Sequence, residues 1–250
     1  MRRFMTICKI EFILFLRDFF SVFFTLVFPT LMLVLFGGIY GNVPLYPGAE
    51  VGVMDSSVPA YCVMVIGVTG LMAFPLTLAG YKEKKIYKRF DATPVGKKSI
   101  MLAQVSVNLA MTLLGIGILL AAGKILYDVQ IRGMAPAIGI SLLFSVTAMF
   151  SMGFLFTALG KDAKITNLLC YLFYFVMLFL SGATIPDMFF SGAVKKIAAL
   201  LPMTYAVDLM QGVFAGERLG GHGKELLVLG AVAAGCTAVG ALLYRKKDWA

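Results

Sequence analysis

Long apolar runs with almost no charge follow one another along the chain, and each is long enough to cross a lipid bilayer. A membrane-spanning helix needs about 20 consecutive apolar residues. The runs do not alternate apolar and polar residues, as the strands of a membrane barrel do in pieces of about 10 residues. The pattern therefore predicts an all-α, polytopic membrane protein with six transmembrane helices. We expect them at residues 19–40, 59–81, 100–123, 134–160, 165–185 and 225–244.

The segment that precedes the first run, residues 1–18, has two different faces. On a helical projection its four basic residues share one arc, while an apolar group that includes Phe12 and Phe15 lies on another. This distribution is typical of an amphipathic helix that lies on the membrane surface. A basic flank of the first span, without further role, is the alternative.

The loop that follows the second run carries a short apolar ridge among many bases. Ile86 and Phe90 are four residues apart and Tyr87 lies beside them, so a helix would bring them together. Pro94 biases the residue before it away from helical geometry and so ends such a helix. Two interpretations fit equally well: a short helix that docks into a groove on another protein, and a solvated basic loop.

The stretch between the fifth and sixth runs is too apolar for a free loop. Apolar residues recur at helical spacing over 194–201 and again over 203–214, and Pro186 and Pro202 punctuate them. Backbone within lipid must form its hydrogen bonds internally. We therefore expect two short helices that dip into the outer leaflet. They would line or close the outer end of a pathway, or only cap the bundle.

Composition and charge agree with lipid surroundings. The chain is 60% hydrophobic and 14% charged, whereas soluble domains are about 45–50% apolar and about 25% charged. Six spans use most of the 250 residues, so we expect a single transmembrane domain over residues 1–250.

Lysine and arginine are divided unevenly between the two ends of the spans. Sixteen of them lie in the two terminal segments and in loops 82–98 and 161–164, and six lie in the remaining loops. Because cytoplasmic loops carry the excess, we expect a multi-pass protein of the cytoplasmic membrane with both termini in the cytoplasm. These charges at span ends, near lipid headgroups, account for the net charge of +9 without a nucleic-acid partner.

No arrangement of residues is typical of an enzyme. The only histidine, His222, lies in a glycine-rich loop, and the four cysteines show no paired spacing. The GKKS stretch at 96–99 resembles the end of a phosphate-binding loop, but the first glycine of that motif would stand at Asp91. Polar residues such as Gln104 and Asn108 occur in the spans, without a clear intramembrane charge, which argues against ion-coupled transport. We expect no catalytic residue, metal or bound cofactor in this chain, and an energy source on another chain.

Two blocks of sequence carry a family resemblance. The first has Glu83, Arg89, Phe90 and then Thr93-Pro94-Val95. The second has Leu180-Ser181-Gly182 with Pro186, followed by Leu201-Pro202-Met203-Thr204-Tyr205-Ala206-Val207-Asp208. With the layout of six runs, these blocks resemble the permease subunit of type 2 ABC exporters over nearly the whole chain. The first block departs from the family, which has Gly-Thr and Glu where this chain has Lys85-Ile86 and Lys88.

The resemblance implies two candidate sites. Residues 82–94 would form a cytoplasmic coupling helix that docks on the ATPase, and residues 186–214 would form re-entrant helices at the outer gate. The coupling residues would be Glu83, Ile86, Tyr87, Arg89, Phe90, Thr93 and Pro94. The residues of the outer gate or pathway would be Ser181, Gly182, Pro186, Pro202, Thr204, Tyr205 and Asp208.

The resemblance also implies partners. A complete transporter has two permease subunits and two ABC ATPase subunits, with ATP and Mg²⁺ on the ATPases. This chain would pair with a second copy or with a sister permease. Its apolar, uncharged spans favour an amphipathic drug, peptide antibiotic or lipid as the exported substrate. Polysaccharide or glycolipid export, and a passive channel or membrane anchor that is not coupled to ATP, remain as alternatives.

Overall fold

The computed structural model describes residues 2–45, 51–91, 96–184 and 190–246, and it is a bundle of helices without a β-strand in these ranges. Six helices are long and apolar enough to cross a membrane. The predicted fold class is therefore confirmed. The spans are Phe19–Tyr40, Val53–Glu83, Lys98–Tyr127, Ala135–Leu159, Ala163–Leu180 and Leu219–Tyr244.

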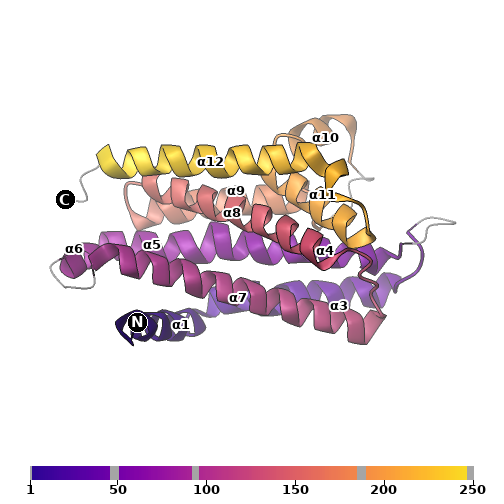
Figure 1. The fold of residues 1–250 in the computed structure, drawn as a ribbon, viewed down its shortest axis with the longest axis horizontal. Coiled ribbons are helices and arrows are strands. Elements are labelled where there is room, and N and C mark those ends of the chain that lie inside the picture. Colours follow the sequence, from indigo (N-terminus) through magenta and orange to yellow (C-terminus); the bar gives the residue numbers. More distant parts are fainter. Residues whose placement is uncertain (1, 46–50, 92–95, 185–189, 247–250) are drawn as a thin grey trace.

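The spans run side by side, and both termini lie at the same end of the bundle (Figure 1). We call this the termini end and the opposite one the hairpin end. Three spans are the single helices α7 (Gly96–Tyr127), α8 (Ala135–Leu159) and α9 (Ala163–Leu180). The last span combines the short η4 (Leu219–His222) with α12 (Gly223–Lys246), which packs mainly along α8.

The first two spans are each interrupted by a π-helical segment. The first consists of α2 (Phe19–Val22), η1 (Phe23–Val27) and α3 (Phe28–Tyr40), and the second of α4 (Val53–Val68), η2 (Thr69–Ala73) and α5 (Phe74–Glu83).

Prolines account for both interruptions. Pro29 and Pro75 stand directly after the first residue of α3 and of α5. Proline has no N–H to donate and its ring crowds the preceding turn, so the helix widens there. In both places the residue before the proline donates to the carbonyl five residues back: Phe28 to Phe23, and Phe74 to Thr69.

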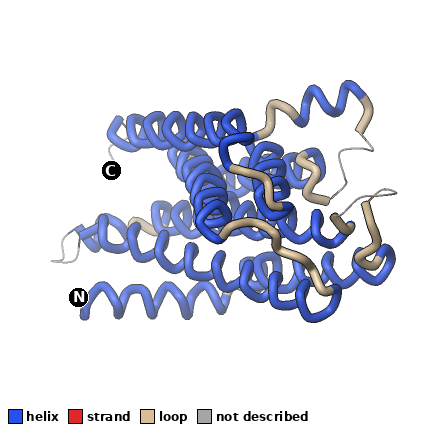
Figure 2. Tube along the Cα trace, turned by 45° about the vertical axis from the view of Figure 1, so that its right-hand side comes forward, coloured by secondary structure: helices blue, strands red, loops and turns tan. Residues whose placement is uncertain are grey.

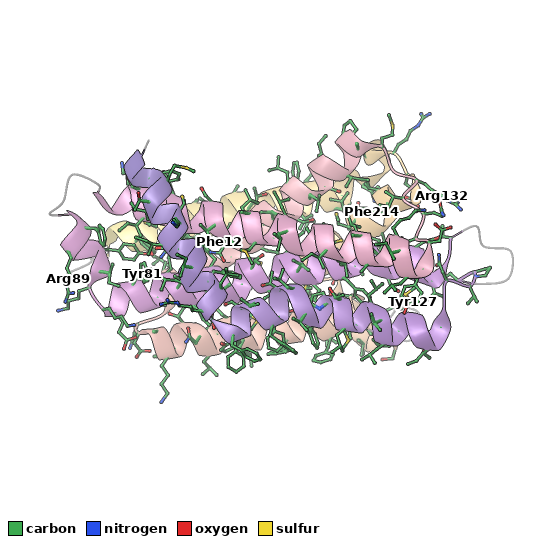
Figure 3. The ribbon with its side chains drawn as sticks, turned by 90° about the horizontal axis from the view of Figure 1, so that it is seen from below. Phe12, Tyr81, Arg89, Tyr127, Arg132 and Phe214 are labelled. Atoms are coloured by element: carbon green, nitrogen blue, oxygen red, sulfur yellow. The ribbon has the colours of Figure 1, made fainter. Side chains whose placement is uncertain are left out.

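The N-terminal helix α1 (Arg2–Arg17) runs across the bundle rather than along it (Figure 3). It packs against α7 through one face, on which Glu11 and Phe15 are buried, while Phe12 is exposed on another. This placement is that of an interfacial helix, as the sequence predicts.

The hairpin between the fifth and sixth spans consists of α10 (Gly192–Ala198) and α11 (Pro202–Ala215), bent by 92° at the break between them. It lies at the end opposite the termini (Figure 2). Leu201 is extended and Pro202 begins α11, so proline sets the break. The pair fits the predicted re-entrant hairpin.

The core is built around the second span. Of its most apolar stretch, 89% is buried within the protein, by α7, α8 and α11 among others. Glycines allow the closest approach, because a Cβ on Gly153 of α8 would collide with the carbonyl oxygen of Gly70 in η2. The second span therefore connects the termini end to the hairpin end through the centre of the molecule.

Candidate functional site

The predicted coupling residues lie at the termini end, on and beside the short helix α6 (Ile86–Asp91). Glu83 and Arg89 are exposed, and Arg89 points away from the bundle (Figure 3). Ile86 is half-buried. The predicted residues Thr93 and Pro94 lie outside the described residues.

Two aromatic residues of α6 face the bundle instead. Tyr87 is 4% exposed, and Phe90 packs against the cluster that includes Tyr87, Phe74 and Phe150. The predicted ridge therefore packs inward: Tyr87 and Phe90 fasten α6 to the bundle, while Arg89 beside them is exposed.

The inward face of α6 ends in a buried polar junction. The hydroxyl of Tyr87 donates a hydrogen bond of 3.0 Å to Oε1 of Gln104 in α7. Glu11 of α1 joins the same junction and is 6% exposed. Burial raises the pKa of the Glu11 carboxyl above its usual range, and hydrogen bonding with Tyr81 and Gln104 partly offsets this. Burial likewise raises the pKa of Tyr87.

Sequence analysis missed Glu11, although a signal was present. Phe4, Cys8, Glu11 and Phe15 recur at helical spacing, and the structure turns this face towards the bundle. A charged residue on the apolar side of an amphipathic helix requires a polar partner. That partner is formed by residues from α5, α6 and α7, which no local pattern reveals.

The hairpin end contains a pocket of about 380 Å³, within the size range of sites for small molecules. Its walls come from α4, the end of α9, α10, α11 and the start of α12. Of the predicted gate residues, Ser181, Gly182, Thr204, Tyr205 and Asp208 line it together. Pro202 stands at the first position of α11, and Pro186 lies outside the described residues.

Hydrogen bonds across the break hold two of these residues in place. Oγ1 of Thr204 donates to the carbonyl of Ala198, and the hydroxyl of Tyr205 donates to the carbonyl of Ala199, each over 2.7 Å. Gln211 connects α11 to α4 through a 3.0 Å bond from Nε2 to the carbonyl of Ser56. The wall between the hairpin and the second span is thus fixed by side-chain bonds to backbone.

The pocket combines apolar walls with charged groups. Tyr61 and Val207 contribute apolar surface, and Lys195, Lys224 and Asp208 contribute charge. Nζ of Lys224 lies 5.3 Å from the centre of the Tyr205 ring, which is within range of a cation–π interaction. Neither lysine was among the predicted site residues, because they lie on α10 and α12, far apart in the sequence, and only the fold places both at the pocket.

In the described parts of the chain no group of three or more His, Cys, Asp or Glu residues could hold a metal ion. What the geometry offers is a short helix with Arg89 exposed at one end, a pocket of mixed polarity at the other, and one buried span between them.

The comparison with protein families accounts for this arrangement. A family model described as ABC-2 type transporter matches residues 2–215, from α1 to the end of α11. The chain belongs to the ABC-2 type transporter family. Members are the membrane components of ABC transporters, so the chain is a transporter permease subunit and a multi-pass membrane protein. Membership also implies an ABC ATPase subunit as partner. Among curated proteins, none matches.

Proposed function

We propose that this permease is half of the membrane pathway of an ATP-driven exporter. It pairs with a second copy or a sister permease, and two ABC ATPase subunits bind the two termini ends in the cytoplasm. The substrate is amphipathic and leaves through the hairpin end. The observation that carries this proposal is the second span, whose two ends adjoin the basic helix α6 and the pocket.

Charge and exposure at the termini end support α6 as the ATPase contact. The loop from 82 to 98 holds seven of the chain's 22 Lys and Arg residues, and Arg89 is exposed while Tyr87 anchors the helix. A short helix that packs against the bundle on one face and is exposed on the other can be displaced by a bound partner and remain attached to the bundle.

Charge reversal tests this contact. Arg89→Glu should abolish co-purification with the ATPase, because it changes the exposed face and leaves the anchoring face intact. Lys164→Glu is the matched control: it makes the same change of charge at another exposed position, in the first turn of α9. Equal co-purification of the ATPase with both variants, at equal expression, would rule out α6 as the contact.

The mixed walls of the pocket support an amphipathic substrate. Tyr61 and Val207 suit a hydrocarbon or aromatic portion, while the lysines, Asp208 and the hydroxyls suit a polar headgroup. The sequence of the second span has no Asp, Glu, Lys or Arg from Ser56 to Tyr81, so a highly charged polymer has less to bind along this route.

Stimulated ATP hydrolysis tests the substrate class. The permease–ATPase complex in lipid vesicles is given a rhodamine dye, an NBD-labelled phospholipid or an undecaprenyl-linked oligosaccharide. We expect one of the first two to raise the hydrolysis rate, and Tyr205→Ala to weaken that stimulation without loss of basal hydrolysis. Stimulation by the oligosaccharide alone would instead favour glycolipid export.

A further inference from the structure

A line of polar side chains runs along one buried face of α7. Gln104, Asn108 and Thr112 are spaced four residues apart, which puts them on one side of the helix. Their exposed fractions are 0%, 4% and 0%. Polar side chains inside a membrane protein are costly unless they face the interior and find partners. The hydrogen-bond partners of these three side chains therefore indicate their role.

The two ends of the line reach two different elements. At the termini end, Tyr87 of α6 donates to Oε1 of Gln104 over 3.0 Å. At the other end, Oγ1 of Thr112 lies 2.7 Å from Oγ1 of Thr69, the first residue of η2. The line thus joins the coupling helix to the π-helical segment over eight residues of α7, which is about 12 Å at the rise of an α-helix.

The links within the line follow the helix itself. Nδ2 of Asn108 donates to the carbonyl of Gln104 over 2.9 Å, and Oγ1 of Thr112 also lies 2.7 Å from the carbonyl of Asn108. A hydroxyl has a single proton. When Thr112 donates to Thr69, the Thr69 hydroxyl donates to the carbonyl of Val65 or Ile66. When Thr112 donates to its own helix, the Thr69 hydroxyl can donate to Thr112 instead, so both protons are satisfied in either arrangement. This is a contact between helices with two alternative states, as a transmitting element requires.

The segment η2 is placed to convert such a change into movement. It divides the second span into α4 and α5, directly before Pro75, and π-helical segments of this kind are frequent at functional sites. The far end of α4 contributes Ser57 and Tyr61 to the pocket. A change of geometry at η2 changes the direction of α4 relative to α5, and with it the shape of the pocket.

We propose that Gln104 and Thr112 are positioning residues that connect α6 to η2, so that displacement of α6 reaches the pocket through the Thr112–Thr69 hydroxyl pair. This inference rests on the proposed function, because it takes α6 as the element that the ATPase displaces.

A reporter cysteine in the pocket tests the connection. Ser57→Cys is introduced into the permease, the complex with its ATPase is placed in lipid nanodiscs, and the rate of labelling by a charged maleimide is measured with and without ATP and vanadate. Of the native cysteines, Cys62 and Cys170 are buried, and the protein without the reporter gives the background of the other two. We expect ATP and vanadate to change the labelling rate of the reporter.

Hydroxyl removal at Thr112 gives the decisive comparison. Thr112→Val keeps the shape of the side chain and should lose most of the ATP-induced change, while Thr112→Ser keeps the hydroxyl and should retain it. Thr147→Val is the matched control, since Thr147 is exposed on α8 and, among the described residues, its hydroxyl bonds only to the backbone of its own helix. Co-purification with the ATPase and thermal stability should be equal for all three variants.

Thr69→Val removes the other half of the pair and provides a second route to the same answer if Thr112→Val does not fold. The double variant should respond no less than either single one. A wild-type response in Thr112→Val or Thr69→Val, or an equal loss in Thr112→Ser, would overturn the inference and leave the proposed function standing. An unmutated reporter protein that binds no ATPase, or whose labelling ignores ATP, would overturn both.

Discussion

The second and the last spans are almost equally apolar and have opposite surroundings. Their mean hydropathies are 2.1 and 2.3, but 89% of the apolar stretch of the second is buried within the protein, against 11% for the last. Lipid and a protein interior are both apolar, so hydropathy measures the need to leave water and not the choice between the two. The buried span contains the π-helical segment η2 and contacts both α6 and the pocket.

The difference between the two spans predicts opposite effects of one substitution. Gly153→Ala places a methyl group against the carbonyl of Gly70 in the second span, and such overpacking costs about 1–3 kcal/mol or more. Gly235 of α12 has open space around it, so Gly235→Ala should stabilise the helix by about 0.5–1 kcal/mol. Thermal stability in detergent measures both changes, and a comparable loss in the two variants would contradict the contrast in packing.

At the hairpin end, substitutions beside the second and the last span should also differ in their effect on stability. Asn42 accepts hydrogen bonds from the backbone N–H groups of Met54 and Asp55, and donates to the Asp55 carboxylate over 3.0 Å. Asn42→Ala removes the acceptor of the Met54 and Asp55 N–H groups, at a cost of about 1–3 kcal/mol, while the Asp55 carboxylate keeps its bonds from the N–H groups of Gly52 and Gln130.

The start of the last span supplies the comparison for Asn42. Nε2 of His222 lies 3.0 Å from a carboxylate oxygen of Glu217, whose side chain is 64% exposed. The His222 side chain is itself 12% exposed, but water competes for the exposed Glu217 carboxylate, and ion pairs with such a partner contribute about 0–1 kcal/mol, so His222→Ala should shift the melting temperature less than Asn42→Ala. The reverse order would show that the last span depends more on its anchor than the second one does.

At the termini end, the buried carboxyl beside the second span should give the stability a pH dependence. Since burial raises the pKa of Glu11, the folded protein holds this proton more tightly than the unfolded chain. This contribution to stability is complete below the usual range of a glutamate and disappears as pH rises through the raised pKa.

Glu11→Gln removes the titration. The variant should be more stable than the wild type at neutral pH. The melting temperature of the wild type should fall as the pH rises above the usual pKa range of a glutamate, and that of the variant should not. Melting temperatures measured across this range test the expectation. Glu225→Gln, in the first turn of α12, is the control for the last span and should keep the decline of the wild type.

The smallest effect on thermal stability is expected from removal of a buried hydroxyl, that of Tyr174. Tyr174 of α9 is 0% exposed, packs beside Gly67 of the second span, and its hydroxyl has no hydrogen-bond partner among the described residues. Tyr174→Phe removes this unpaired hydroxyl, so the protein should be unchanged or more stable by up to about 1 kcal/mol. A clear loss of thermal stability would mean that the hydroxyl has a partner in the assembled transporter.

Patterns local to the sequence predicted most of the fold. Apolar runs located six spans, helical spacing located the surface helix and the hairpin, and Pro202 marked the break. These features are local because a helix in lipid must satisfy its backbone within its own segment. The gate residues that line the pocket came from the family resemblance, since nothing in their spacing identifies a pocket.

Only the tertiary structure decided which apolar surfaces pack against protein and which polar groups form contacts with one another. Thr112 could have bonded to its own helix, and its link to Thr69 exists only because α7 packs against η2. Glu11 is buried beside Tyr81 and Gln104 of other helices, and Lys195 and Lys224 line one pocket although they lie on α10 and α12. The sequence by itself determined six spans and their need to leave water. The choice between lipid and protein depends on contacts between distant segments, which hydropathy does not record.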